Sequence, residues 1–587
     1  MLKILKNYNK RDVCLIIICI LFVVLQVFLE LKMPDYMSEI TKLVQTEGSQ
    51  MKDILVNGGY MITCALGSLV AAVITGYITS RISSNFSKTI RKKLFNKVED
   101  LAMQEVKQFS TSSLITRTTN DITQIEMLIA MGLQLLIKAP ITAIWAITKI
   151  LNKSWQWSAI TAVAVAVLMA TIATLMVIVL PRFKKVQKLI DKLNGVTREN
   201  LTGIRVVRAF NAEQYQEEKF DKANNNLTNQ QLFNQKVFAV MQPMMYIIMY
   251  MVTLSIYYVG AYLIKDAGMA DKISLFGDMV VFSSYAMQVI MSFLMLAMIF
   301  MMLPRAQVSA NRINEVLDTE ISIKDGKINT KTNNEVGTVE FKNVSFKYPD
   351  ADEYLLKDIS FKANKGDTVA FIGSTGSGKS TLINLIPRFY DATEGEVLVD
   401  GINVKNYTQE FLHDKIGYVP QKAVMFNGTV KSNISYGDNG KEKPTDEQIK
   451  KAIEVAQGTE FVEKMDGQYD AHMAQGGTNV SGGQKQRLSI ARAIARNPEI
   501  YIFDDSFSAL DYKTDSVLRK ELKKYTSDAT SLIVAQRIGT IMNADQIVVL
   551  DNGVIVGKGT HKELLKTCEV YKQIALSQLS KEELENG

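Results

Sequence analysis

Residues Gly373 to Ser380 read G-S-T-G-S-G-K-S, after the apolar run Val369 to Ile372. They match the pattern G-x-x-x-x-G-K-[ST], and with the apolar run before them and Thr381 to Ile386 after them they predict a strand, a loop and a helix. Glycines let the backbone curl, so that successive N–H groups point at phosphate oxygens, while Lys379 supplies a cation and Ser380 a hydroxyl for Mg²⁺. The stretch predicts an α/β domain that binds a nucleotide, and the alternative is a glycine-rich turn that matches by chance. The predicted nucleotide-binding residues are Gly373, Ser374, Thr375, Gly376, Ser377, Gly378, Lys379, Ser380 and Thr381.

A second stretch, Tyr501 to Asp511, reads Y-I-F-D-D-S-F-S-A-L-D. An apolar strand that ends in Asp504 fits the Mg²⁺-holding acid of a P-loop NTPase. The next position is where such ATPases carry the acid that polarises the attacking water. Here that position is Asp505, which is one methylene shorter than the expected glutamate.

Val480 to Arg487 reads V-S-G-G-Q-K-Q-R and precedes a run typical of a helix. The phosphate loop, the S-G-G-Q, the Asp504 strand and the turn Ser508 to Asp511 follow one another in an order and spacing that resemble the nucleotide-binding domain of ATP-binding cassette (ABC) transporters. The resemblance implies that Tyr348 stacks on adenine. It also implies that Gln421, together with Ser380 and Asp504, reaches Mg²⁺.

In ABC transporters the S-G-G-Q of one domain closes over ATP held by the phosphate loop of another. The resemblance therefore implies that this chain needs a second nucleotide-binding domain. Its signature residues Ser481, Gly482, Gly483 and Gln484 would act in trans, at a predicted helix start that suits a phosphate.

The chain departs from the family pattern at two positions. Gln536 stands where the family carries the His that contacts the γ-phosphate, and glutamine cannot become a cation. Asp505 is pulled back from the water by one methylene, and a misplacement of about 1 Å can cost about a hundredfold in rate. Both catalytic positions are therefore predicted to be degenerate, with ATP binding retained, and harmless drift in an active site is the alternative. The pattern resembles the degenerate-site subunit of heterodimeric ABC exporters, whose partner carries an intact Glu and His.

The chain has 587 residues and 47% hydrophobic residues, and its apolar stretches lie before residue 305. Segments near the length of about 20 residues that crosses a bilayer number six, at 12–33, 54–80, 131–151, 157–181, 237–264 and 276–303. Lys and Arg in the N-terminal segment and in the second and fourth connections predict that the N-terminus and the ATPase domain are cytoplasmic. Such basic residues near the membrane account for the net charge of +7, so no nucleic-acid partner is predicted.

The predicted fold class is an α-helical membrane domain of exporter type with six spans, followed by an α/β P-loop NTPase domain. The predicted domains are a transmembrane domain at 1–317, a polar linker at 318–337 and the nucleotide-binding domain at 338–587. The two long cytoplasmic connections resemble the exporter arrangement, in which short coupling helices lie at the bottom. We place these helices near 112–117 and 207–217, and surface helices without a coupling role are the alternative.

Two features of the spans concern the cargo. Methionines recur every three or four residues along the sixth span, from Met287 to Met302; they suit either a cavity for varied lipophilic compounds or packing against other helices. Polar side chains within the spans more often face a bundle interior than lipid, although snorkelling is an equal explanation for Glu30 and Lys138. The polar residues concerned are Gln26, Glu30, Lys138, Gln242 and Gln288.

The sequence thus predicts an ATP-driven exporter subunit for small lipophilic, multidrug-like substrates, which lies in the cytoplasmic membrane among membrane lipids, binds ATP and Mg²⁺ and forms a heterodimer. Four alternatives stay open: a homodimeric exporter, an exporter of lipids or peptides, an importer on an exporter scaffold, and an ATP-gated regulatory subunit.

Overall fold

The structure is a computed structural model that describes residues 2–5, 8, 10–46, 48–151, 154–331 and 335–579. It divides into two compact units. The first contains Met1–Glu99 and Thr111–Thr319, and the second contains Asp100–Ser110 and Glu320–Gly587.

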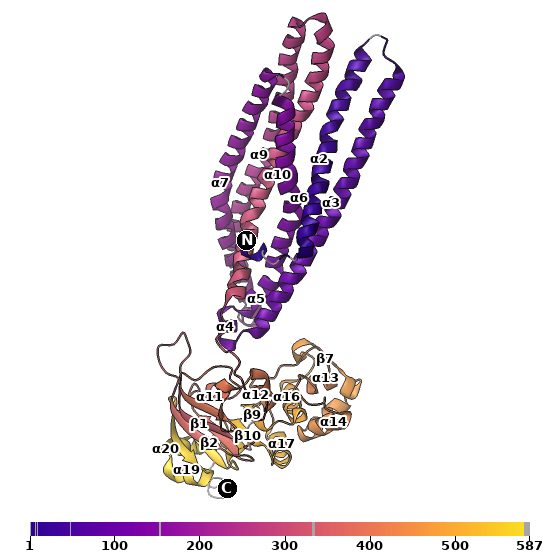
Figure 1. The fold of residues 1–587 in the computed structure, drawn as a ribbon. Helices are drawn as coiled ribbons and strands as arrows, with labels where there is room; N and C mark the ends of the chain where they lie inside the picture. Colours follow the sequence, from indigo (N-terminus) through magenta and orange to yellow (C-terminus); the bar gives the residue numbers. More distant parts are fainter. Residues whose placement is uncertain are drawn as a thin grey trace. The chain divides into compact units, whose positions relative to one another are not determined.

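Long helices build the first unit (Figure 1). Six of the described helical segments are long and apolar enough to cross a membrane, and each contains one of the predicted spans except that the fourth segment ends two residues earlier. A short helix, α1 (Leu2–Leu5), precedes the long ones, which are α2 (Lys10–Gln45), α3 (Met51–Asp100), α6 (Asn120–Leu151), α7 (Trp155–Thr202), α9 (Glu213–Asp266) and α10 (Met269–Asp318).

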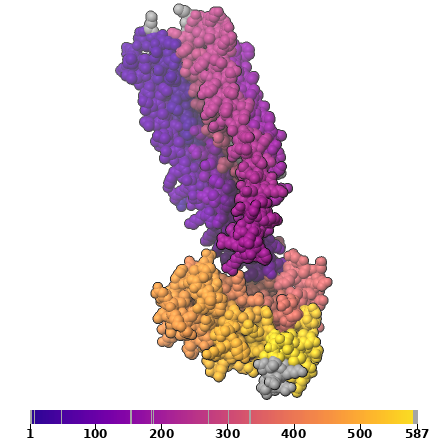
Figure 2. Space-filling view, turned by 180° about the vertical axis from the view of Figure 1, so that it is seen from behind, coloured from indigo at the N-terminus to yellow at the C-terminus, as the bar shows by residue number. Residues whose placement is uncertain are grey.

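Apolar side chains cover much of the outside of this unit. Leu21, Leu66 and Ile144 each expose more than half of their surface, as expected of helices that face hydrocarbon or another subunit rather than water. In the space-filling view the surface of the unit falls into two bands, the indigo residues of α2 and α3 and the magenta residues of the later helices (Figure 2).

The first long connection contains two short helices in and near the segment where a coupling helix was predicted. The chain leaves helical conformation around Leu101 and again at Phe109, and the short helix α4 (Met103–Gln108) lies between these turns. The residues predicted to form the coupling helix, near 112–117, lie within the short helix α5 (Thr111–Thr118), which packs in the first unit. Leu101 and Phe109, which lie at the two turns, are both buried.

The second long connection contains α8 (Ile204–Ala209) between α7 and α9. It overlaps the start of the predicted segment 207–217, whose later residues already belong to α9.

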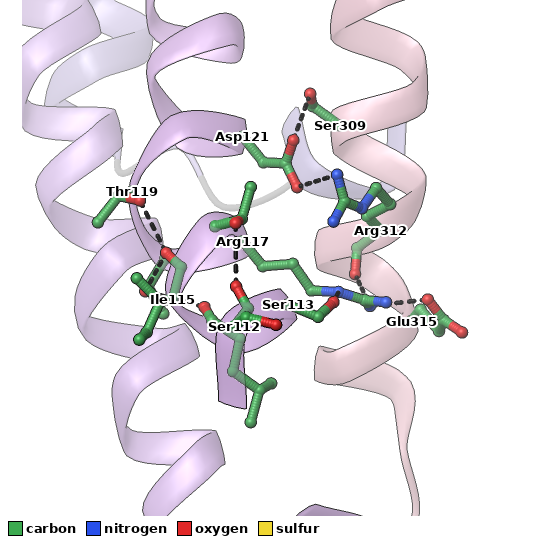
Figure 3. Close-up of polar contacts among 12 residues, drawn as sticks. Ser112, Ser113, Ile115, Arg117, Thr119, Asp121, Ser309, Arg312 and Glu315 are labelled. Carbon is green, nitrogen blue, oxygen red and sulfur yellow. Dashed lines mark hydrogen bonds and ion pairs between the residues drawn. The ribbon is translucent and has the colours of Figure 1, made fainter. Parts of the chain in front are cut away.

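A cluster of charged side chains joins the first connection to the end of α10 (Figure 3). The Arg117 guanidinium donates from Nη1 to the Arg312 carbonyl oxygen at 2.6 Å and to Glu315 Oε2 at 2.7 Å. On the next turn, Asp121 Oδ1 accepts from Ser309 Oγ at 2.9 Å, and its Oδ2 lies 3.3 Å from Arg312 Nη1. Arg117 and Asp121 are buried, so these contacts hold α5 and α6 against the segment of α10 that leads out of the unit.

We expect Arg117→Glu to lower the melting temperature of the purified protein by several degrees, because the variant places a carboxylate beside Glu315 and removes the donor to the Arg312 carbonyl oxygen. Because the Arg117 side chain is 10% and the Glu315 side chain 59% exposed, the loss should be smaller than the about 3 to 5 kcal/mol that breaking a fully buried pair costs. Adding Glu315→Arg should restore part of the loss, since the charge pair is regained but the bond to the Arg312 carbonyl is not. The matched control is the exchange of Lys219 and Glu199, an exposed pair, which should change stability by less than about 1 kcal/mol. Equal melting temperatures for wild type and Arg117→Glu would contradict the inference that the Arg117 contacts hold α5 and α6 against α10.

The second unit contains two main β-sheets and the helices that pack against them (Figure 1). A four-stranded antiparallel sheet has the order β2-β1-β4-β5, and a six-stranded sheet has the order β12-β11-β3-β10-β9-β6. Within the second sheet β11, β3, β10, β9 and β6 run parallel, so their carboxyl ends lie at one edge, where ligands bind in open α/β sheets. The strand bounds are β1 (Val339–Phe346), β2 (Leu356–Ala363), β3 (Thr368–Gly373), β4 (Glu394–Val399), β5 (Ile402–Asn403), β6 (Ile416–Val419), β9 (Ile500–Asp504), β10 (Thr530–Val534), β11 (Gln546–Asp551) and β12 (Val554–Gly559).

Helices cover the larger sheet, and two apolar cores lie on its two faces. The central strands β3 and β9 are almost continuously apolar and buried, as strands covered on both faces should be. The main helices are α11 (Lys379–Asn384), α13 (Val430–Ile434), α14 (Asp446–Val455), α16 (Gly482–Arg496), α17 (Tyr512–Tyr525), α19 (His561–Thr567) and α20 (Glu569–Gln578).

The segment predicted as a linker contributes to the second unit. The Ile328 amide donates to the Asn406 carbonyl at 3.0 Å, the Gly326 amide donates to the Tyr407 carbonyl at 2.8 Å, and Ile323 is buried. Residues 332–334 of this segment lie outside the described residues. The polar composition of 318–337 therefore conceals a stretch that is anchored by backbone hydrogen bonds.

Candidate functional site

The phosphate loop leaves the carboxyl end of β3 and enters α11 at Lys379, as its sequence pattern requires. Gly378 has φ +93°, a left-handed conformation that glycine adopts without strain. A Cβ on Gly373 would lie 2.0 Å from the Leu550 carbonyl oxygen, so the neighbouring strand leaves room for glycine alone. The Lys379 ammonium lies across the loop and donates to the carbonyl oxygens of Gly373 at 2.9 Å and Ser374 at 2.7 Å.

Ser380 and Asp504 lie face to face, and the Ser380 hydroxyl donates to Asp504 Oδ1 at 2.7 Å. They come together because β9 ends at Asp504 two strands away from β3, with β10 between them. A hydroxyl, a carboxylate and nucleotide phosphates are the oxygen ligands that Mg²⁺ prefers. Among the described residues no three His, Cys, Asp or Glu side chains form a metal-binding group, so an ion held here would depend on the phosphates.

Asp505 is the centre of a small hydrogen-bonded group beside these residues. Gln536 Nε2 donates to Asp505 Oδ2 at 2.8 Å, and Gln421 Nε2 lies 3.5 Å from the same oxygen. Asp505 has φ +46°, in the left-handed region that Asp tolerates better than most residues. The structure therefore brings the two degenerate positions, Asp505 and Gln536, into direct contact.

The charges at this edge are buried, and burial changes their proton affinities. Burial lowers the pKa of the Lys379 ammonium, although the carboxylates of Asp505 and Asp504 oppose the change. Burial raises the pKa of Asp504 against the hydrogen bond from Ser380, and it also raises the pKa of Asp505. The three groups lie where water is scarce, which strengthens their interaction with a charged ligand.

Tyr348, the predicted adenine-stacking residue, is linked to the phosphate-loop helix, since its hydroxyl lies 3.0 Å from Thr381 Oγ1. Its ring meets Tyr390 edge to face at 5.4 Å. The Lys107 ammonium lies 5.0 Å from the Tyr348 ring centre and 5.3 Å from that of Tyr390. The sequence analysis missed Lys107 and Tyr390. Lys107 lies more than two hundred positions before Tyr348 in the chain, and the residues around Tyr390 give no sign that it lies near the phosphate loop.

The S-G-G-Q residues lie at the start of α16. Ser481 is the N-cap, with its hydroxyl accepting from the Gln484 amide at 3.3 Å while Gln484 Oε1 accepts from the Ser481 amide at 2.8 Å. Ser481 and Gly482 are exposed. Among the hydrogen bonds of the described residues, none joins this group to the phosphate loop of the same chain, so the structure gathers all the predicted site residues except the four of the signature.

This arrangement defines a membrane-embedded P-loop ATPase, with six apolar helices in one unit and a nucleotide-binding fold in the other. Residues 16–293 match the family described as ABC transporter transmembrane region, and residues 356–508 match the family described as ABC transporter.

Similar proteins support the same assignment. The chain is 40% identical over 522 residues to an uncharacterized ABC transporter ATP-binding protein of Mycobacterium tuberculosis, covering 89% of this chain and 87% of the relative. It is 31% identical over 489 residues to the ATP-dependent lipid A-core flippase of Pseudomonas aeruginosa, covering 83% and 79%. Among solved structures, a bacterial Atm1-family ABC exporter with ATP bound matches with a TM-score of 0.81 at 25% identity, covering 97% of this chain and 99% of the other.

The chain belongs to the ABC transporters, and its architecture is that of an exporter half-transporter. Its nucleotide-binding domain binds ATP, and the activity of this architecture is ATP hydrolysis coupled to transport. The predicted fold class is thereby confirmed.

Proposed function

We propose that this chain is the subunit of a heterodimeric exporter that holds the slowly hydrolysing ATP site. The observation that carries the proposal is the 2.8 Å hydrogen bond from Gln536 Nε2 to Asp505 Oδ2. This carboxylate oxygen already accepts a hydrogen bond from the Gln536 amide, and it is the oxygen that would have to take a proton from the attacking water. Glutamine offers no cation to the γ-phosphate, so the pair lacks both contributions that the water-activating groups make.

ATP binding is retained in this proposal. Tyr348 stacks on adenine and the backbone of 373–378 surrounds the phosphates, while Lys379 neutralises their charge. Ser380, Asp504 and the side-chain oxygen of Gln421 would hold Mg²⁺, which would offset the negative charge of the phosphates. The pairing of Ser380 with Asp504 and the raised proton affinity of buried Asp504 fit a site completed by a divalent cation.

The exposed signature supplies the other half of the proposal. Ser481, Gly482, Gly483 and Gln484 would close over ATP on the phosphate loop of a partner half-transporter with an intact Glu and His. A helix start with free backbone N–H groups suits the γ-phosphate. The assembled pair would then hydrolyse ATP mainly at the phosphate loop of the partner, in a site that this chain completes.

We place the assembly in the cytoplasmic membrane with the nucleotide-binding domain on the cytoplasmic side, because the basic residues of the connections favour that orientation. Lipophilic small molecules are the first candidate cargo. A lipid is the second, and the 31% identity to a protein described as a lipid A-core flippase favours it.

Purification of the full chain with and without its partner tests the proposal. The chain alone should bind ATP but hydrolyse it at least about tenfold more slowly than the complex with a different half-transporter, and native mass spectrometry should show two masses in that complex. Brisk hydrolysis by a preparation that contains only this chain would overturn the proposal and favour a homodimer.

A further inference from the structure

Three helices of the first unit meet at the carboxylate of Glu30, inside the predicted spans. Its Oε1 accepts from Lys138 Nζ at 2.9 Å, from Gln26 Nε2 at 2.9 Å and from Ser68 Oγ at 3.2 Å. Gln26 shares α2 with Glu30, Ser68 lies on α3 and Lys138 lies on α6. The sequence left snorkelling as an equal explanation for Glu30 and Lys138, and the structure pairs their two side chains across helices.

The hydrogen-bonding capacity of this group is only partly used. All three contacts fall on one carboxylate oxygen, and the Glu30 Oε2 atom has no hydrogen bond among the described residues. The Gln26 side chain is 4% exposed, and its Oε1 is buried without a partner among the same residues. An ammonium has three donors, and Lys138 uses one of them on Glu30. The group therefore offers two acceptors and further donors side by side.

The group is accessible as well as unsatisfied. The side chains of Glu30 and Lys138 keep 24% and 18% of their surface exposed. An unpaired buried amide oxygen is energetically unfavourable, and charged groups within a span are costly and often mark substrate pathways.

The charge of the group limits what it can bind. Glu30 and Lys138 together carry no net charge, so a ligand that is only a cation or only an anion would bring an uncompensated charge into a site with little water. A headgroup that contains both an ammonium with N–H donors and an anionic oxygen keeps the site neutral, and it can use the acceptors and the donors together.

We propose that Glu30, Gln26 and Lys138 bind the headgroup of a zwitterionic amphiphile, with its ammonium N–H groups donating to Glu30 and Gln26 and its anionic oxygen accepting from Lys138. The proposal deepens the exporter function proposed above, on which it rests, by naming the chemical class of the cargo. The long apolar part of the ligand suits the exposed apolar surface of the surrounding helices.

The test is binding of lysophospholipids with one fluorescent acyl chain and different headgroups to the purified full-length transporter. The phosphoethanolamine form should bind about tenfold more tightly than the phosphocholine form, which has no N–H, and than the phosphoglycerol form, which has no cation. Soluble phosphoethanolamine without a chain is a further arm. If soluble phosphoethanolamine competes at concentrations similar to those of the lysophospholipid, the site binds a free zwitterion. If it competes only weakly, the site binds a lipid. Both results support a headgroup with an ammonium and an anionic oxygen.

Two substitutions give distinct signatures. Glu30→Gln should remove the preference for phosphoethanolamine over phosphocholine, and Lys138→Met should remove the preference for phosphoethanolamine over the plain amine with the same chain. The matched control is Glu39→Gln, the same change at an exposed position of α2, which should alter neither. Where Glu30→Gln lowers expression, Gln26→Leu tests the same acceptor group without removing a charge.

Equal affinity for all four headgroups, or a preference that survives both Glu30→Gln and Lys138→Met, would overturn the proposal and leave a structural ion pair. Tight binding of the phosphoglycerol form alone would also overturn it. ATP hydrolysis by the complex with the partner, measured without lysophospholipid, should be unchanged in these variants, so failure of the cargo site is distinguishable from failure of the nucleotide-site proposal.

Discussion

The double substitution Asp505→Glu with Gln536→His is expected to raise ATP hydrolysis at this chain's own site by about tenfold to a hundredfold. The longer side chain brings its carboxylate back toward the attacking water, and the imidazole can carry a positive charge beside the γ-phosphate. Both changes are needed, because the Gln536 amide donates to Asp505 in the structure. A glutamate introduced alone would still face this donor.

The measurement is single-turnover hydrolysis by the assembled transporter, with the catalytic Glu of the proposed partner replaced by Gln so that only this site contributes. Asp505→Glu alone is the first control and should give a smaller gain. Ser506→Ala is a second control, since Ser506 neighbours Asp505 but its hydroxyl donates to the Val419 carbonyl rather than to the water-activating pair. A double variant as slow as wild type would mean that these positions do not limit hydrolysis.

Ser481→Asp is expected to reduce ATP hydrolysis by the assembled transporter by at least about a hundredfold while leaving ATP binding to this chain's phosphate loop intact. Aspartate is as good an N-cap as serine, so α16 keeps its start and the chain keeps its fold. The introduced negative charge, however, would face the γ-phosphate on the partner's loop, where serine and the backbone amides offer donors.

Thr445 provides a control of the same kind, because it caps α14 with a reciprocal bond to Gln448. Thr445→Asp makes the same chemical change at a helix start that has no predicted role at a nucleotide, and it should leave hydrolysis within about twofold of wild type. Steady-state ATPase assays and binding of a fluorescent ATP analogue to each variant separate the two effects. Normal hydrolysis with Ser481→Asp would show that this signature does not complete the partner's active site.

The sequence by itself determined the class of the nucleotide-binding domain and its main elements. The phosphate loop lies between β3 and α11, and Asp504 ends β9, because the local pattern of apolar strand, glycines and helix leaves the chain few alternatives. The six membrane spans were equally readable, since about 20 apolar residues in a row have no other stable place. In both regions, neighbours along the chain carry the information.

Only the tertiary structure decided which distant residues meet. Sequence comparison implied that Asp505 and Gln536 serve one site, but the bond between them depends on parallel pairing of β9 and β10. The turns at Leu101 and Phe109, the contact of Lys107 with Tyr348, and the convergence of Gln26, Ser68 and Lys138 on Glu30 left no local signal. Each depends on packing between segments far apart in the chain, where burial and pairing of charge outweigh local preference.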